Sequence, residues 1–141
     1  MYWFYYALTS SILWGISYAV AERVIKNVNI PTSIMFGYFV GFIITLIYNV
    51  LYGDIRSDIN NITSKTLFMM LFTAIINTTA VFLINNAIQQ KNATYAGLIE
   101  ISYPLFTIIA SYVIFSELQV NFRSVIGAVL ILSGVFFVVR S

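Results

Sequence analysis

The 141-residue chain has no cysteine and no histidine, and charged residues make up only 9% of it. Without thiols and imidazoles, the chain cannot form disulfides, thiolate nucleophiles, histidine acid–base pairs or nearly any of the usual zinc sites. The seven Lys and Arg residues are scattered, so the sequence has no basic patch of the kind that follows nucleic-acid phosphates. We therefore expect no metal, no cofactor and no nucleic-acid partner.

Apolar residues are abundant by contrast: 60% of the chain is hydrophobic, and its mean hydropathy is +0.91. A soluble domain usually has about 25% charged and about 45–50% apolar residues. The polar surface here is too small to cover a globule in water, so the excess apolar surface must face lipid. We expect an integral, multi-pass protein of the plasma (inner) membrane.

Five apolar segments follow one another along the chain, joined by short polar connections. Segments of about 20 apolar residues cross the hydrocarbon core as helices, because backbone groups in lipid must be paired within the segment. The predicted fold class is an all-α integral membrane protein in which residues 1–141 form a single domain. The five expected spans are Tyr2–Ala21, Thr32–Tyr52, Thr66–Ile88, Ala93–Phe115 and the short Ser124–Val139.

The first segment ends in Ala19-Val20-Ala21, which resembles a signal-peptidase site, and cleavage there would leave four spans. No Lys or Arg precedes this segment, which is also long and rich in aromatic residues. Retention as a membrane span is therefore the favoured interpretation.

Positive charge is split almost evenly between the two sides of the membrane. With five spans, one side carries Arg23, Lys26, Lys91 and Arg140, and the other carries Arg56, Lys65 and Arg123. Orientation follows an excess of Lys and Arg on the cytoplasmic side, and a difference of one residue is hardly an excess. Two interpretations remain: a weakly fixed orientation with the N-terminus outside, or insertion of the chain in both orientations.

Small and polar residues share one face of the fourth segment, at helical spacings of three, four and seven. Glu100 is the acidic member of this face. A charged carboxylate in the bilayer costs about 3 kcal/mol on insertion scales and marks a functional hypothesis. A carboxyl group that changes between neutral and charged forms beside a cavity can support proton coupling or bind a cationic substrate. The alternative is a structural group that is permanently neutral or paired with Lys91.

Pro104 follows Glu100 by four residues, removes one helical hydrogen bond and is expected to kink the helix there. The kink would free the carbonyl of Glu100, or would only shape helix packing. Elsewhere, amides such as Asn85 serve either as interhelical glue or as substrate contacts. The candidate substrate- and proton-binding residues are Glu100, Trp14, Tyr18, Tyr103, Asn85 and Ser17, and the predicted packing residues are Gly37, Gly41, Gly127 and Gly134.

Two stretches carry a family resemblance: "LWGISYAVAERVIKN" near the start, and "ATYAGLIEISYPLFTIIASYVIFSELQVNFRSVIGAVLILSGVFFVV" at the end. The sequence resembles one five-helix EamA-type repeat of the drug/metabolite transporter superfamily. The matching positions are Trp14-Gly15, Pro104, Glu117, Gly127 and Gly134. The sequence departs from the family pattern at Tyr103, since a carboxylate or polar residue often precedes the proline, so the role of Glu100 is inferred from this chain alone.

Most members of that family join two such repeats, in inverted topology, into ten helices that carry metabolites or drugs by alternating access. The resemblance therefore implies that this chain is one half of a transporter. It would be completed by an antiparallel copy of itself or by a paralogous half-transporter. We expect a secondary transporter of small, cationic or drug-like solutes, coupled to protons.

Two other function classes remain. One is a non-transporting small membrane protein that assembles with or stabilises a partner complex, although the chain has no large loop or tail for such contacts. The other is a membrane enzyme, which the lack of His, Cys and paired acidic residues disfavours.

Overall fold

The computed structural model describes residues 2–117 and 120–139, and these form helices joined by short connections, with no strand among them. The order of the helices follows the apolar segments of the sequence. The helices are α1 (Tyr2–Val24), α2 (Ile30–Tyr52), α3 (Ile55–Asn61), α4 (Ser64–Gln90), α5 (Ala93–Glu100), α6 (Tyr103–Phe115) and α7 (Phe122–Val139).

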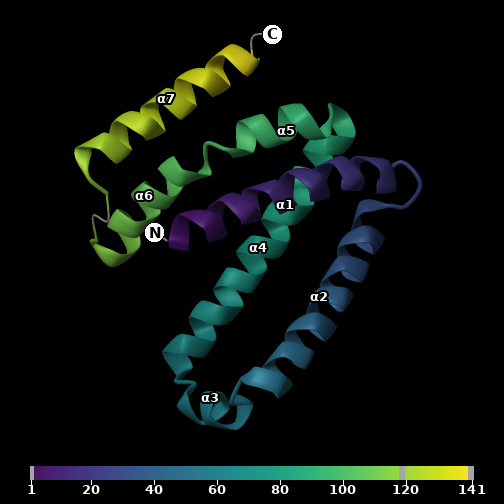
Figure 1. The fold of residues 1–141 in the computed structure, drawn as a ribbon, viewed down its shortest axis with the longest axis vertical. Coiled ribbons are helices and arrows are strands. Elements are labelled where there is room, and N and C mark those ends of the chain that lie inside the picture. The colour runs from purple at the N-terminus through teal and green to yellow at the C-terminus, as the bar shows by residue number, and fades with distance from the viewer. Residues whose placement is uncertain (1, 118–119, 140–141) are drawn as a thin grey trace.

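The long helices α2 and α4 run in opposite directions and are joined at one end by the short α3 (Figure 1). At the other end, α1 lies across α4, and the chain turns back through α5 (Figure 1). Helix α5 contacts α1, α4 and α7. The short helix that ends in Glu100 thus packs against three other helices.

Five helices begin at a side-chain cap, which satisfies backbone N–H groups that have no partner within the helix. In each case an oxygen of the capping side chain accepts a hydrogen bond from the backbone N–H three residues later. The caps are Asn29 for α2 (3.0 Å), Asp54 for α3 (3.1 Å), Thr63 for α4 (3.2 Å), Asn92 for α5 (2.9 Å) and Asn121 for α7 (3.0 Å). The polar connections of the sequence therefore set where the helices start.

The hydrophobic core is small. Among the described residues, the buried apolar side chains are Ile25, Ile30, Ile88, Ala93, Ala96 and Ala128. All but Ala128 form one cluster, where the end of α1, the start of α2, the end of α4 and the start of α5 meet. Most large apolar side chains of the long helices lie on the outside instead, as expected for helices that face lipid or another chain.

Three segments of the described chain are long and apolar enough to cross a membrane: Ile30–Tyr52, Ser64–Gln90 and Ala93–Phe115. A further apolar helix, Phe122–Val138, is shorter. Helix α1 has 23 residues but begins with five aromatic side chains in a row, four of which have a polar tip. Three of the five expected spans are thus supported by length and composition, and the spans at the two ends of the chain stay predictions.

The fourth predicted span, Ala93–Phe115, is not one continuous helix. Helix α5 ends at Glu100 and α6 begins at Tyr103, so the interruption falls at Ile101–Ser102. Pro104 is the second residue of α6, a position where a backbone N–H has no intrahelical partner and proline is well tolerated. The proline starts a new helix here, whereas the sequence suggested a bend within a single one.

The four predicted packing glycines do not meet a neighbouring helix within this chain. A methyl group added at Gly37, Gly41, Gly127 or Gly134 would find no atom of another element within 4 Å. Their role in close helix packing stays a prediction, because no described residue makes such a close contact with them.

Candidate functional site

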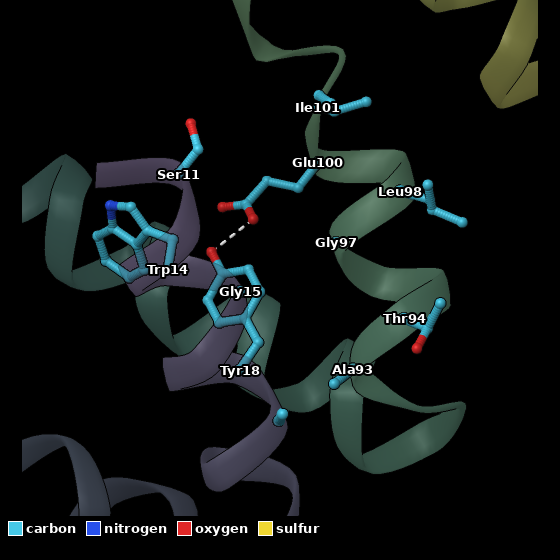
Figure 2. A pocket seen from close by; sticks show the side chains of 11 residues that line it. Ser11, Trp14, Gly15, Tyr18, Ala93, Thr94, Gly97, Leu98, Glu100 and Ile101 are labelled. Atoms are coloured by element: carbon cyan, nitrogen blue, oxygen red, sulfur yellow. Dashed lines mark hydrogen bonds between the residues drawn. The ribbon is translucent and has the colours of Figure 1, made fainter. Parts of the chain in front are cut away.

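The candidate site lies between α1 and the end of α5. Trp14 and Tyr18 are four residues apart on α1 and so share one face of that helix. Their ring centroids are 5.6 Å apart, with a tilt of 55° between the planes. Figure 2 shows the Tyr18 hydroxyl directed toward Glu100, the last residue of α5, with the Trp14 ring on the other side of Tyr18.

A hydrogen bond joins the two helices at this point: the Tyr18 hydroxyl donates to Oε2 of Glu100 at 2.5 Å (Figure 2). Both side chains are partly buried. Gly97, one helical turn before Glu100, lies beside the Tyr18 ring, and a methyl group there would be 3.6 Å from Cδ2 of the tyrosine. A small residue at this position leaves room for the ring to lie against α5, with its hydroxyl at the carboxylate.

The other end of α5 is also tied to α1. Oε2 of Glu22 accepts a hydrogen bond from the backbone N–H of Ala93 at 2.9 Å. Glu22 also forms an ion pair with Lys26 on the same helix, with Nζ and Oε1 3.7 Å apart. Negative charge is favourable at a helix N-terminus. The start of α5 is therefore stabilised both by Glu22 of α1 and by its own N-cap residue, Asn92.

Two cavities border the Tyr18–Glu100 contact. The first, of about 420 Å³, lies between α1 and α5. The second, of about 560 Å³, lies among α1, α4, the end of α5 and α6. Both volumes fall within the range of small-molecule sites. The two cavities share Trp14, Tyr18 and Glu100 in their walls.

Each cavity adds polar groups of its own to this shared wall. Ser11 and Thr94 line the first cavity. Thr73 and Asn77 of α4, with Tyr103 and Thr107 of α6, line the second. The result is a carboxylate beside three aromatic rings and several uncharged hydrogen-bonding groups.

Four of the six predicted binding residues meet at this place: Glu100, Trp14, Tyr18 and Tyr103 all line the second cavity. The other two do not. Ser17 is exposed and belongs to neither lining, and the amide of Asn85 donates to the carbonyl of Val81 on its own helix at 2.8 Å.

Sequence reasoning offered Lys91 as a partner for Glu100, and the structure gives each a different neighbour. The Lys91 ammonium lies over the ring of Tyr95, 4.8 Å from its centroid, while Glu100 is bonded to Tyr18. The polar wall formed by Thr73, Asn77 and Thr107 was not among the predicted site residues. Two of these carried a usable signal: Thr107 follows Glu100 by seven residues, and Asn77 is one of the amides in the same apolar segment as Asn85.

The chemistry of this arrangement suits an organic cation better than a metal ion. A single carboxylate supplies charge, and aromatic faces attract cations through their ring quadrupoles. Over residues 2–117 and 120–139, no group of three or more His, Cys, Asp or Glu side chains could hold a metal ion.

The fold and the site are those of a helical membrane protein with a polar site between its helices. A family model for the EamA-like transporter family matches residues 1–140, and the chain belongs to this family. It is therefore an integral membrane protein of the drug/metabolite transporter superfamily. No curated protein and no solved structure gave a match to the sequence.

Proposed function

We propose that this protein is a secondary transporter that moves small organic cations or drug-like solutes by alternating access in exchange for protons. The observation that carries the proposal is the Glu100 carboxylate, which lies in the walls of two cavities beside Trp14, Tyr18 and Tyr103. Membership of a transporter family supports the general activity. The ionisable group, which can hold either a proton or a cation, supports the coupling.

We further propose that the functional unit contains two such chains of five spans each, inserted in opposite directions in the plasma (inner) membrane. A homodimer is the simplest form, and a paralogous half-transporter is the alternative partner. The exposed glycines Gly37 and Gly134 support this assembly, because within the described residues no atom of another element lies within 4 Å of a methyl group added there. Small residues on membrane helices allow the backbones of two chains to approach closely.

Transport in reconstituted vesicles tests the role of Glu100. With tetraphenylphosphonium as the probe and an imposed pH gradient, the wild-type protein should accumulate the cation. Glu100→Gln keeps the shape of the side chain but can neither carry a charge nor exchange a proton, so its uptake should fall to the level of empty vesicles.

Asp58→Asn on α3 is the matched control, since it neutralises an acidic residue that lies outside both cavities. Its uptake should equal that of the wild type. Undiminished pH-driven uptake by Glu100→Gln would remove Glu100 from the mechanism. If no variant, wild type included, exceeds empty vesicles, the protein is not a carrier of such cations, and the non-transporting partner role becomes the better explanation.

A further inference from the structure

The Tyr18 hydroxyl occupies the same carboxylate that a cation would need. Its hydrogen bond to Oε2 of Glu100 links residues 82 positions apart in the sequence, so it exists only when α1 and α5 are packed together. Among the described residues Glu100 has no ion-pair partner. The Lys91 ammonium lies over the ring of Tyr95, and Lys26 pairs with Glu22. The neutral Tyr18 hydroxyl therefore lies where a cation would bind the Glu100 carboxylate.

The same contact stands between the two cavities. Trp14, Tyr18 and Glu100 are the residues common to both linings, and they come from the facing sides of α1 and α5. The Tyr18 ring is supported from behind by Gly97 and by the cluster of Ile25, Ile30, Ile88, Ala93 and Ala96. The wall between the cavities thus consists of the packed Tyr18 ring, whose hydroxyl makes one hydrogen bond to Glu100 at the end of α5.

The chain continues from that helix through a short hydrogen-bonded turn. Glu100 is the last residue of α5, and the interruption at Ile101–Ser102 follows it directly. The start of α5, in contrast, is capped by Glu22 and Asn92 and buries Ala93 and Ala96. The end that carries the carboxylate has no fully buried residue and is joined to α1 by the Tyr18 hydroxyl.

We propose that Tyr18 is a latch on Glu100: its hydroxyl competes with an organic cation for the carboxylate and, while bonded, keeps the two cavities separate. This inference rests on the proposed function for its ligand class, and it assigns Tyr18 a positioning role toward Glu100. A cation that binds Glu100 displaces the hydroxyl, and the two cavities then share one opening across the site. No covalent bond changes in this step.

Binding in detergent tests the latch independently of transport. The chain has two tryptophans, so Trp3→Phe leaves Trp14, in the shared wall, as the only reporter of tetraphenylphosphonium binding by fluorescence quenching. In this background, Tyr18→Phe keeps the ring and removes the competing hydroxyl. Because a hydrogen bond to a charged group is worth roughly a factor of ten or more in equilibrium, the Kd should fall about tenfold.

Transport by the same variant should show a split between binding and rate. The KM for tetraphenylphosphonium uptake falls with the Kd, and the maximal rate falls as well, because a cation that no hydroxyl displaces leaves Glu100 more slowly. A merely structural tyrosine would give weaker binding and lower stability together. Tyr95→Phe is the matched control, as another partly buried tyrosine whose ring faces Lys91, and its Kd should equal that of the background.

An unchanged or higher Kd in folded Tyr18→Phe would overturn the latch, as would the absence of any binding in the background and in the variant. If Tyr18→Phe does not fold, Glu100→Asp replaces it. Its shorter side chain draws the carboxylate away from the hydroxyl and should also lower the Kd, and unchanged or weaker binding in that variant would count against the proposal. Tighter binding without any uptake would keep the latch and refute transport, so the two ideas fail separately.

Discussion

At the scale of single residues, the sequence indicated which kinds of side chain form the candidate site more accurately than it indicated which residues line it. Glu100 stood out because acidic residues are rare in apolar helices. Periodicity says which residues of one helix lie together, but not which face meets a neighbour. For that reason Ser17, next to Tyr18 in sequence, was predicted as a site residue and lies outside the cavities.

Gly97 gives a residue-scale prediction about space in the first cavity. A methyl group at this position would be 3.6 Å from the Tyr18 ring, which is an ordinary van der Waals contact. Gly97→Ala should therefore bind tetraphenylphosphonium with the Kd of the Trp3→Phe background. Gly97→Leu should bind at least severalfold more weakly, because its longer side chain enters the cavity or displaces the Tyr18 ring.

Trp14 quenching measures both affinities, and a thermal melt shows whether each variant is folded. Equal binding by the alanine and leucine variants would show that the space beside Gly97 does not form part of the binding site.

At the scale of helices, the apolar segments predicted the long elements well, because runs such as Thr32–Tyr52 leave little choice of conformation in lipid. The observed α2 starts two residues earlier, at Ile30, where Asn29 provides the cap. The short α3 and the interruption between α5 and α6 escaped prediction. Hydropathy averages over about 20 residues and does not register a two-residue break such as Ile101–Ser102.

The end of α6 gives an element-scale prediction. Ser116 follows this helix with φ of 56°, a left-handed conformation that glycine adopts without a steric cost. The backbone N–H of Ser116 donates to the carbonyl of Tyr112, which is the hydrogen bond of a left-handed helix end that usually has glycine at this position. Ser116→Gly should therefore raise stability by about 1 kcal/mol, and Ser116→Val should lower it.

Thermal unfolding in one detergent, followed by circular dichroism, compares these two variants with the wild type. Ser33→Gly in the first turn of α2 serves as a control, since it makes the same change in a right-handed helical residue and should destabilise the protein. A lower midpoint for Ser116→Gly than for the wild type would contradict the assigned turn.

At the scale of the whole molecule, composition alone predicted a membrane protein, and the family match confirms that prediction. What composition could not supply is the orientation in the membrane, because it depends on a difference of one Lys or Arg between the two sides. Arg140, which belongs to that count, lies outside the described residues.

Dual insertion is the whole-molecule prediction. Since the chain has no cysteine, Ser57→Cys on the exposed helix α3 places a single thiol in the longest polar connection. An impermeant maleimide should label one population from outside the cell and a second population only after the membrane is opened. Adding Asn60→Lys and Asn61→Lys raises the positive charge of this connection and should leave it almost entirely on the cytoplasmic side.

Labelling from one side only in the Ser57→Cys protein would show a fixed orientation. The second half of the transporter would then have to be a different chain that inserts the other way.

The scarcity of buried apolar side chains has a consequence for how this protein keeps its shape. In a domain with a large core, apolar side chains pack against one another. Here most large apolar side chains contact the surroundings of the protein instead. Its melting temperature therefore depends on the surrounding lipid, detergent or neighbouring subunit as well as on the polypeptide. Acyl-chain length and protein-to-lipid ratio should act on this fold as strongly as point mutations do.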